Sequence, residues 1–244
     1  MLTEPTLQKL KDLSLHGMAE TLLSQTQDPD IGELDFDDRL GLLVDAEWLL
    51  RHNKRLHRRL REAKLRFTSA CTEDIDTGKA RGLDKATLSR LASCAFIEER
   101  TSILITGKTG TGKSYLACAL AQQACRRGHR ALYKRAARFY DELQVARADG
   151  TYPKLLARIA KIDILILDDF GLGTMREHDR LALLDVLEDR FQNRSTIITS
   201  QLPPKTWHAY IGEPTLADSI CDRVMHTSHR VALKGPSRRN TEEN

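Results

Sequence analysis

The fold is decided by the stretch Gly107-Lys108-Thr109-Gly110-Thr111-Gly112-Lys113-Ser114, which matches the pattern G-x-x-x-x-G-K-[ST] in full. The apolar run Ser102–Thr106 leads into it and is typical of a buried strand, and a helix is predicted at Ser114–Arg127. Glycines let the backbone wrap closely, so that consecutive N–H groups and the helix N-terminus point at phosphate oxygens. This context predicts a P-loop, the phosphate-binding turn of a nucleotide site.

Two side chains of this turn indicate its chemistry. Lys113 is expected to reach the β- and γ-phosphates, and the Ser114 hydroxyl is expected to ligate Mg²⁺. We therefore predict ATP and Mg²⁺ as the cofactors. The predicted nucleotide contacts are Gly107, Lys108, Thr109, Gly110, Thr111, Gly112, Lys113, Ser114 and Tyr115.

A second buried run, Ile162–Leu167, ends in the carboxylates Asp168 and Asp169. Ligands of α/β folds bind at the carboxyl ends of the strands. Asp168 is therefore expected to hold Mg²⁺ through water and Asp169 to polarise the attacking water, the alternative being that either one only caps the strand. Because Asp is shorter than Glu, we expect slow hydrolysis. Gln201 follows the next strand, Ser195–Ser200, and is expected near the γ-phosphate unless it is only a turn residue.

The segment after about residue 72 alternates strand and helix patterns, which predicts an α/β fold with a parallel sheet covered by helices on both faces. The predicted strands are Ser102–Thr106, Ala131–Tyr133, Ile162–Leu167 and Ser195–Ser200. The predicted helices are Ser114–Arg127, Ala136–Ala148, His178–Gln192 and Thr215–His226.

Residues 1–68 form a small all-helical domain by the same reasoning, and 69–244 form the nucleotide-binding domain. A short helical pair is expected to break near Leu15-His16-Gly17, and a long helix to run from about Phe36 to Phe67. Apolar positions of the long helix recur in steps of four and three, typical of a seam that packs along another helix. The seam is Leu42, Ala46, Leu49, Asn53, Leu56, Leu60 and Ala63. It predicts self-association, the alternative being packing on its own domain; a buried Asn53 would set register and partner number.

Charge is unevenly distributed, although the formal net charge is only +4. Residues 28–47 contain eight acidic residues and one basic residue, and residues 51–66 contain eight basic residues and one acidic residue. The basic end of the long helix is suited to DNA phosphates, with Arg55, Arg58 and Arg59 as predicted contacts. The alternative is a solvated, charged helix surface.

Composition excludes several classes of protein. The five cysteines are scattered and never form a CxxC pair, which argues against a disulfide framework or a zinc site and for a reducing, cytoplasmic location. No apolar run is long enough to span a membrane, and the polar N-terminus is not that of a signal peptide, so no membrane partner is expected.

Several motifs occur in order along almost the whole chain. They are Leu13-x-Leu15-x-Gly17-Met18, Ile103–Leu116, Asp168-Asp169-Phe170-Gly171, Thr199-Ser200-Gln201-Leu202-Pro203, Trp207, Asp222-Arg223 and Gly235-x-Ser237. With these motifs the sequence resembles the IstB family of transposition helper ATPases, relatives of bacterial replicative-helicase loaders within the AAA+ group. The resemblance implies a AAA+ fold with little or no lid, self-associating N-terminal helices, ATP-driven oligomers around duplex DNA, and a separately encoded transposase as partner.

The same resemblance implies roles for residues near the C-terminus. Arg223 resembles an arginine finger that reaches a neighbouring subunit's γ-phosphate; the alternative is a helix-surface Arg paired with Asp222 or Asp218. Arg239 resembles a nucleotide-sensing residue, although Arg238 stands where relatives usually have an aromatic, so either arginine fits. Relatives often carry Asn where this chain has Gln201, which we expect to change the hydrolysis rate rather than abolish binding.

Lys134, Arg135 and Arg138 follow the second strand, where initiator-type relatives line a DNA channel. The spacing predicts Lys134 and Arg138 on one helix face. Contacts of this kind give affinity without sequence preference. A solvated surface is the alternative.

Two other functions fit the motifs less well. A helicase loader would share the fold and the site, and only its partner would differ. A small-molecule P-loop kinase leaves Arg223 and the basic helix without a role, and no acceptor pocket or arginine-rich lid is evident after Asp169.

Overall fold

The computed structural model describes residues 3–237, and the chain divides into two compact units. We call residues 1–58 the helical unit and residues 59–244 the sheet unit. The boundary between the units falls between Arg58 and Arg59, within the helix α3 (Phe36–Ala63), whereas we placed it after residue 68 from the sequence.

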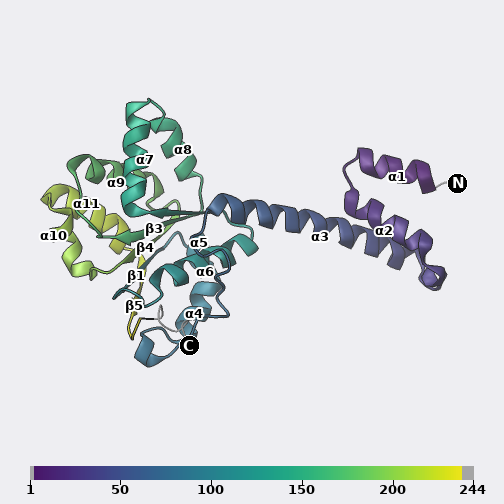
Figure 1. Cartoon of the computed structure of the whole chain (residues 1–244), viewed down its shortest axis with the longest axis horizontal. Coiled ribbons are helices and arrows are strands. Elements are labelled where there is room, and N and C mark those ends of the chain that lie inside the picture. The colour runs from purple at the N-terminus through teal and green to yellow at the C-terminus, as the bar shows by residue number, and fades with distance from the viewer. Residues whose placement is uncertain (1–2, 238–244) are drawn as a thin grey trace. The chain divides into compact units, whose positions relative to one another are not determined.

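The helical unit contains α1 (Thr3–Asp12), α2 (His16–Gln27), the short η1 (Pro29–Glu33) and the first part of α3 (Figure 1). The helices α2 and α3 approach closely at Gly17, where a Cβ would lie 2.7 Å from the Ala46 carbonyl oxygen. The Gly17 N–H donates to the buried Glu47 carboxylate at 2.7 Å. A larger residue than glycine would therefore force these helices apart.

The predicted seam on α3 is largely uncovered in the helical unit. Leu42 and Leu49 are 47% and 53% exposed, and Asn53 is also exposed. Phe36 and Trp48 on the same helix are 74% and 63% exposed. Large apolar side chains left in water together favour packing against another surface.

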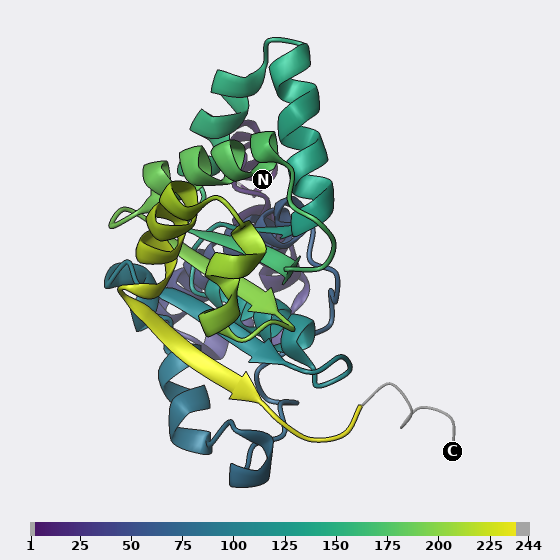
Figure 2. The same ribbon diagram turned by 90° about the vertical axis from the view of Figure 1, so that its left-hand side faces the viewer.

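The sheet unit is built on five strands in the order β2-β3-β4-β1-β5, and every neighbouring pair is parallel. The strands are β1 (Ser102–Gly107), β2 (Ala131–Arg135), β3 (Ile164–Phe170), β4 (Ser195–Ser200) and β5 (Ser228–Leu233). The four predicted strands are confirmed. The fifth was missed because only its second half is apolar; it pairs with β1 at the edge of the sheet, in yellow in Figure 2.

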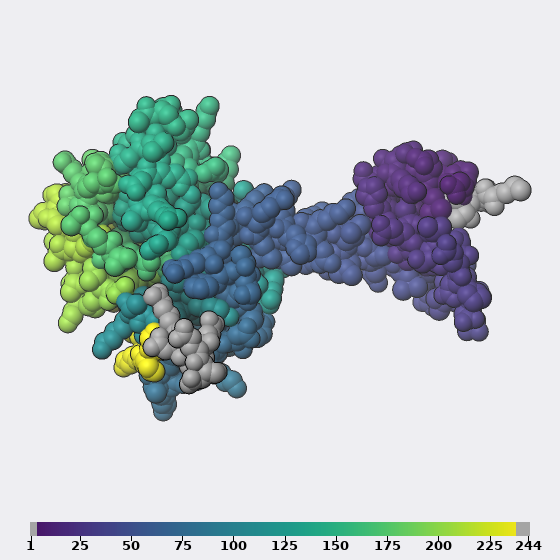
Figure 3. All heavy atoms as spheres, in the orientation of Figure 1, coloured from purple at the N-terminus to yellow at the C-terminus, as the bar shows by residue number. Residues whose placement is uncertain are grey.

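Helices cover both faces of the sheet, as predicted for this fold class. They are α4 (Lys85–Ala92), α5 (Ala95–Glu98), α6 (Lys113–Arg126), α7 (Ala136–Ala148), α8 (Tyr152–Ala160), α9 (Glu177–Arg190), α10 (Trp207–Ile211) and α11 (Pro214–Met225), with the short η2 (Lys79–Arg81) and η3 (Pro204–Thr206). Leu104, Leu165 and Ile198 pack with α7 to α11 in one buried cluster, and α6 packs on the strands with α4 beside it. The pair α7 and α8 forms the teal lobe at the top of the sheet unit in Figures 1 and 3.

Arg190, at the end of α9, is 1% exposed, and its guanidinium donates to a ring of backbone carbonyls. The acceptors are the oxygens of Ile159, Ile162, Asp163 and Ser195, with the Thr196 hydroxyl as a fifth. This one side chain therefore joins α8, α9 and the start of β4.

Arg190→Met is expected to destabilise the sheet unit by about 3 kcal/mol or more, because several buried carbonyls would lose their donor while the volume stays filled. Urea unfolding followed by Trp207 fluorescence in a Trp48→Phe background measures the loss. Arg194→Met, at a partly exposed arginine nearby, is the matched control and should cost less than about 1 kcal/mol. Equal losses in both variants would contradict this account of Arg190.

Candidate nucleotide-binding site

The P-loop connects β1 to α6 and has the backbone geometry that its glycines predict. Gly110 and Gly112 have φ of 82° and 84°, which other residues adopt only with strain. A Cβ on Gly107 would lie 2.4 Å from the Leu233 carbonyl oxygen. The N-terminus of α6 begins at Lys113, whose Nζ donates to the Lys108 carbonyl at 2.9 Å. The turn can therefore present N–H groups, a helix N-terminus and a lysine to phosphate oxygens.

Asp168 is fully buried at the carboxyl end of β3 and accepts three hydrogen bonds. Oδ1 accepts from the Ser114 hydroxyl at 2.7 Å and from the Thr199 hydroxyl at 2.5 Å. Oδ2 accepts from the Tyr133 hydroxyl at 2.5 Å. Burial, followed by this bond to the carboxylate, raises the pKa of Tyr133, so the phenol stays protonated as a donor. Donors from three elements thus fix the orientation of one carboxylate.

The neighbouring Asp169 faces the same site because the strand is irregular there. Consecutive residues of a regular strand point to opposite faces, but the pairing of β3 with β4 shifts between Leu167 and Phe170. Asp169 has φ of 60°, a left-handed conformation that costs an ordinary residue about 1–2 kcal/mol. The Asp169 N–H donates to the Thr199 hydroxyl at 3.0 Å, which supports this turn. This strained conformation turns two adjacent carboxylates toward one site.

Gln201 reaches the P-loop from the end of β4. Its Oε1 accepts from the Thr109 hydroxyl at 2.8 Å. The preceding Ser200 is buried and instead holds the turn, donating to the Phe170 carbonyl and accepting from the Leu202 N–H. The Gln201 side chain, which is longer than the Asn that relatives often carry here, therefore reaches the P-loop.

A cavity of about 480 Å³ adjoins these residues. Its lining includes Lys113, Ser114, Tyr115, Asp169 and Gln201 of the predicted site. The Tyr115 ring, with Phe67, Ile75 and Leu116, forms an apolar part. Phe67 and Tyr115 lie with ring centroids 5.8 Å apart. An apolar part beside a phosphate-binding part matches a nucleotide, whose base is flat and whose other end is charged.

The donor set beside the P-loop fits Mg²⁺. Ser114 offers a hydroxyl oxygen and Asp168 a carboxylate oxygen at 2.7 Å from it. Mg²⁺ prefers oxygen ligands and commonly takes only one or two from protein, the rest coming from water and phosphates. These two residues would hold the ion.

Three polar residues that contact Asp168 were not predicted from the sequence to belong to this site: Tyr133, Thr199 and Arg66, whose Nη1 lies 3.7 Å from Asp168 Oδ2. Tyr133 and Thr199 lie within strands, where an alternating pattern marks them only as core. Arg66 belongs to a basic run that we assigned to DNA. The tight spacing between Thr199 and the predicted Gln201 was the one signal that could have pointed to a polar cluster at the end of β4.

Tyr133→Phe is expected to weaken Mg²⁺-dependent binding of a non-hydrolysable ATP analogue by about tenfold, because a buried carboxylate oxygen loses its donor and Asp168 its fixed orientation. A Mg²⁺ titration of analogue binding measures this. Tyr140→Phe is the control, since the buried Tyr140 hydroxyl has no partner within residues 3–237. A Tyr133→Phe protein with unchanged Mg²⁺ dependence would show that the hydroxyl does not position Asp168.

Arg223 lies far along the sheet from the P-loop. It is in α11, which leads through Thr227 into β5, and the Thr227 carbonyl accepts from the Ser102 N–H at 3.0 Å. This places the end of α11 beside the start of β1, whereas the P-loop follows the end of β1. The Arg223 guanidinium pairs with Glu188, not with the Asp218 or Asp222 that we considered, and donates to the Ser219 carbonyl at 3.0 Å.

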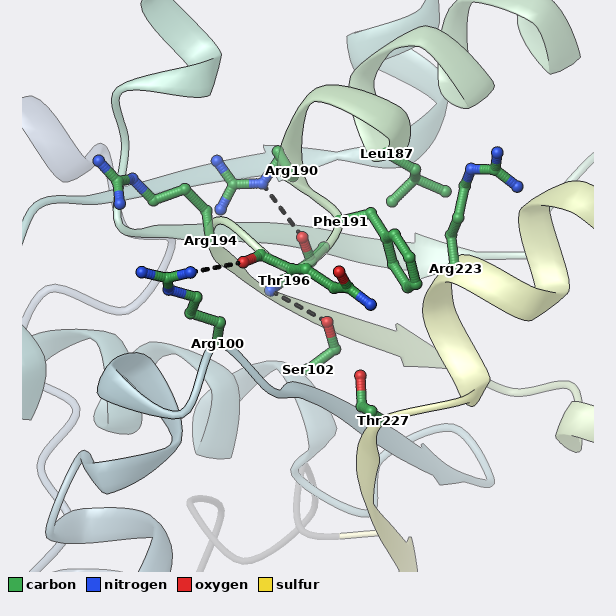
Figure 4. Close-up of a pocket in the computed structure, with 10 residues that line it drawn as sticks. Arg100, Ser102, Leu187, Arg190, Phe191, Arg194, Thr196, Arg223 and Thr227 are labelled. Carbon is green, nitrogen blue, oxygen red and sulfur yellow. Dashed lines mark hydrogen bonds between the residues drawn. The ribbon is translucent and has the colours of Figure 1, made fainter.

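Figure 4 shows Arg223 at a small pocket at this amino edge of the sheet, together with Arg100 and Arg194. Arginines from α11, from the segment before β1 and from the segment before β4 therefore line this pocket, with Arg223 on one side of Phe191 and Arg100 and Arg194 on the other. Arg239 and Arg238, the two candidates for a nucleotide-sensing arginine, lie outside the described residues.

The basic residues predicted for DNA contact differ in their surroundings. Lys134 lies in β2 and pairs with Glu142, so the prediction that it shares a helix face with Arg138 is wrong: the strand extends to Arg135 and α7 begins after it. Arg138 is exposed on α7. Arg135 pairs with Asp169 at 3.2 Å. Arg55 and Arg58 are exposed on α3 in the helical unit, and Arg59 is half-buried in the sheet unit.

The fold and the site together define a AAA+ P-loop NTPase. The fold is similar to that of the DnaC helicase loader, with a TM-score of 0.56 at 18% identity over 68% of this chain and 97% of that chain. DnaA from Aquifex aeolicus, solved with AMPPCP bound, gives a TM-score of 0.56 at 20% identity, over 68% of this chain and 49% of that chain. At these identities the likeness concerns the fold.

The chain belongs to the family of IstB-like ATP-binding proteins, whose model matches residues 8–244. An insertion-sequence ATP-binding protein of Sinorhizobium fredii is 44% identical over 98% of this chain and 97% of its own length. The ATP-binding protein of insertion sequence IS1162 from Pseudomonas fluorescens is 48% identical over 84% of this chain and 89% of its own length. The predicted family, the AAA+ fold and ATP binding are thus confirmed. Among residues 3–237 no helix combines the length and apolarity needed to cross a membrane.

Proposed function

We propose that this protein is an ATPase switch of transposition, which assembles on duplex DNA when ATP is bound, recruits or stimulates a transposase, and resets by hydrolysis. The relatives are named for insertion sequences, mobile elements that encode a transposase, which supports the biological setting. The observation that carries the proposal is the separation of Arg223 from the P-loop of its own chain.

The separation follows from the sheet. The strand β1 has six residues and rises about 17 Å between its ends. Arg223 lies beside the start of that strand and the P-loop beyond its end, so the arginine cannot complete its own nucleotide site. A neighbouring protomer can receive it, because Arg223 lies at an edge where Arg100 and Arg194 add positive charge. Hydrolysis would then require assembly.

Two surfaces support assembly on DNA. The uncovered seam of α3, with Leu42 and Leu49 exposed, suits a second copy of the helical unit. The exposed Arg138 on α7, and Arg55 and Arg58 on α3, offer cations to phosphates without reading sequence. Lys134 is a weaker candidate because Glu142 already neutralises it.

The residues of the site have separate tasks in this mechanism. The P-loop N–H groups and Lys113 bind and orient the triphosphate. We assign Gln201 to the terminal phosphate, and its hydrogen bond from the Thr109 hydroxyl of the P-loop supports this role. Asp169 orients the attacking water and takes its proton as the new P–O bond forms and the bond between the γ-phosphorus and the bridging oxygen breaks, with ADP as the leaving group. Asp168 and Ser114 hold Mg²⁺, which when bound neutralises charge on the β- and γ-phosphates. Arg223 of a neighbour stabilises the charge that develops on the transferred group.

The direct test is electron microscopy of the full chain with duplex DNA in the presence of a non-hydrolysable ATP analogue, ADP or no nucleotide. Ordered oligomers on DNA are expected with the analogue only. If assembly is the same with ADP, the switch model fails. Pull-down of the assembled form identifies its partner, and recovery of a replicative helicase in place of a transposase would replace the proposed role with that of a helicase loader.

A further inference from the structure

Arg66 lies just beyond α3, in the sheet unit, and its backbone is anchored on both sides. The helix ends at Ala63, which is fully buried, and Lys64 turns the chain with φ of 50°. Leu65 and Ala70 are also buried. The Cys118 thiol of α6, whose pKa burial raises to about 11, lies near the backbone of Arg66 and Phe67. The side chain of Arg66 therefore starts from a fixed point beside the nucleotide site.

Its guanidinium reaches the two site carboxylates. The Arg66 Nη1 lies 3.7 Å from Asp168 Oδ2 and 4.0 Å from Asp169 Oδ2. The guanidinium carbon lies 5.3 Å from the centre of the Phe67 ring. Arg66 lines the same cavity as Lys113 and Ser114, and its side chain is 37% exposed. Its guanidinium is therefore open to the cavity and lies near both carboxylates.

Charge decides which ligand needs this cation. Asp168 and Asp169 put two negative groups at the end of the P-loop, so a terminal phosphate placed there meets repulsion. Lys113 compensates from one side. Arg66 adds a planar, permanently charged donor set that matches phosphate oxygens. ADP has no phosphate at this position, so the benefit is specific to the triphosphate.

We propose that Arg66 binds the terminal phosphate of ATP within the same protomer and makes the site prefer ATP over ADP. The proposal rests on the nucleotide site of the proposed switch and assigns it a residue for distinguishing the two nucleotides. It differs from the role of Arg223, which acts on a neighbour and only in the assembly.

Isothermal titration calorimetry of the full chain without DNA tests the proposal, with a non-hydrolysable ATP analogue and with ADP, each in Mg²⁺ and in EDTA. Arg66→Ala is expected to weaken analogue binding by about tenfold or more and ADP binding by less than about threefold. Arg66→Lys keeps the charge but loses the planar donor set, so an intermediate loss is expected. Arg90→Ala, at an exposed arginine of α4, is the matched control and should bind both nucleotides as the wild type does.

Two results would overturn the proposal. Equal losses for both nucleotides in Arg66→Ala and Arg66→Lys would mean that Arg66 only supports the fold of the site. Tighter binding of the analogue in Mg²⁺ by either variant would mean that Arg66 competes with the ion for Asp168. Thermal unfolding of each variant identifies a folding defect. If Arg66→Ala is defective in folding, the binding data for Arg66→Lys decide the outcome. If the wild-type protein binds ATP but does not assemble on DNA, the proposed switch is wrong, and the calorimetric test of Arg66 can still be made.

Discussion

Arg223→Ala is expected to lower DNA-stimulated ATP hydrolysis by about three orders of magnitude, while each protomer keeps its affinity for ATP within about twofold. The reason is geometric: Arg223 lies beside the start of β1 and the P-loop beyond its end. The loss therefore falls on sites completed by a neighbour. Steady-state hydrolysis with saturating duplex DNA and equilibrium binding of a non-hydrolysable ATP analogue measure the two quantities separately.

A mixing experiment shows whether the arginine acts between protomers. Asp169→Asn protomers retain Arg223, and Arg223→Ala protomers retain Asp169, so neither hydrolyses well alone. Mixed oligomers should regain activity because an Asp169 site then receives a neighbour's arginine. Glu188→Ala removes the carboxylate that pairs with Arg223 within the chain and is expected to preserve DNA-stimulated hydrolysis. If Arg223→Ala hydrolyses ATP as the wild type does, or if mixing restores nothing, Arg223 is a surface residue paired with Glu188.

The nucleotide site illustrates how far local sequence leads. The run from β1 through Gly107 to Ser114 carries its own geometry, since glycines at fixed spacing and a following helix leave one way to wrap a phosphate. The pair Asp168 and Asp169 was also placed at the right edge of the sheet. That both face one site could not be read from the strand pattern, because alternation predicts opposite faces and the irregular pairing with β4 decides otherwise.

What the sequence did not reveal depends on contacts between distant segments. Tyr133 and Asp168 are 35 positions apart, and only the pairing of β2 with β3 brings the phenol to the carboxylate. Arg66 stands in a basic run whose simplest interpretation is a DNA contact, and nothing local indicates that the chain turns at Lys64. The strand β5 lacks a full apolar pattern because it lies at the sheet edge with one neighbour. Tertiary packing decided each of these cases.

Asp169→Asn is expected to reduce hydrolysis by about 10²- to 10⁴-fold while ATP-loaded oligomers persist on DNA. An amide keeps the size of the side chain but cannot take the proton of the attacking water. It also removes a negative charge from the place where the terminal phosphate lies, so affinity for ATP is expected to stay the same or rise. Single-turnover hydrolysis, and the lifetime of oligomers on DNA after ATP is diluted, measure the two effects.

The variant also separates ATP-dependent assembly from release by hydrolysis, and it does so with ATP itself as the ligand. Asp141→Asn, at an exposed carboxylate of α7 that pairs with Arg176, is the matched control and should leave both quantities unchanged. Arg135 pairs with Asp169 at 3.2 Å and would lose that charged partner in Asp169→Asn, so Arg135→Ala should be measured alongside. Because Arg135 is also a predicted DNA contact, single-turnover hydrolysis decides: a fall in Asp169→Asn but not in Arg135→Ala attributes the trapping to the missing base. A variant that leaves DNA as fast as the wild type would mean that release is driven by something other than hydrolysis, because the step blocked by the substitution would then have no bearing on how long the assembly lasts.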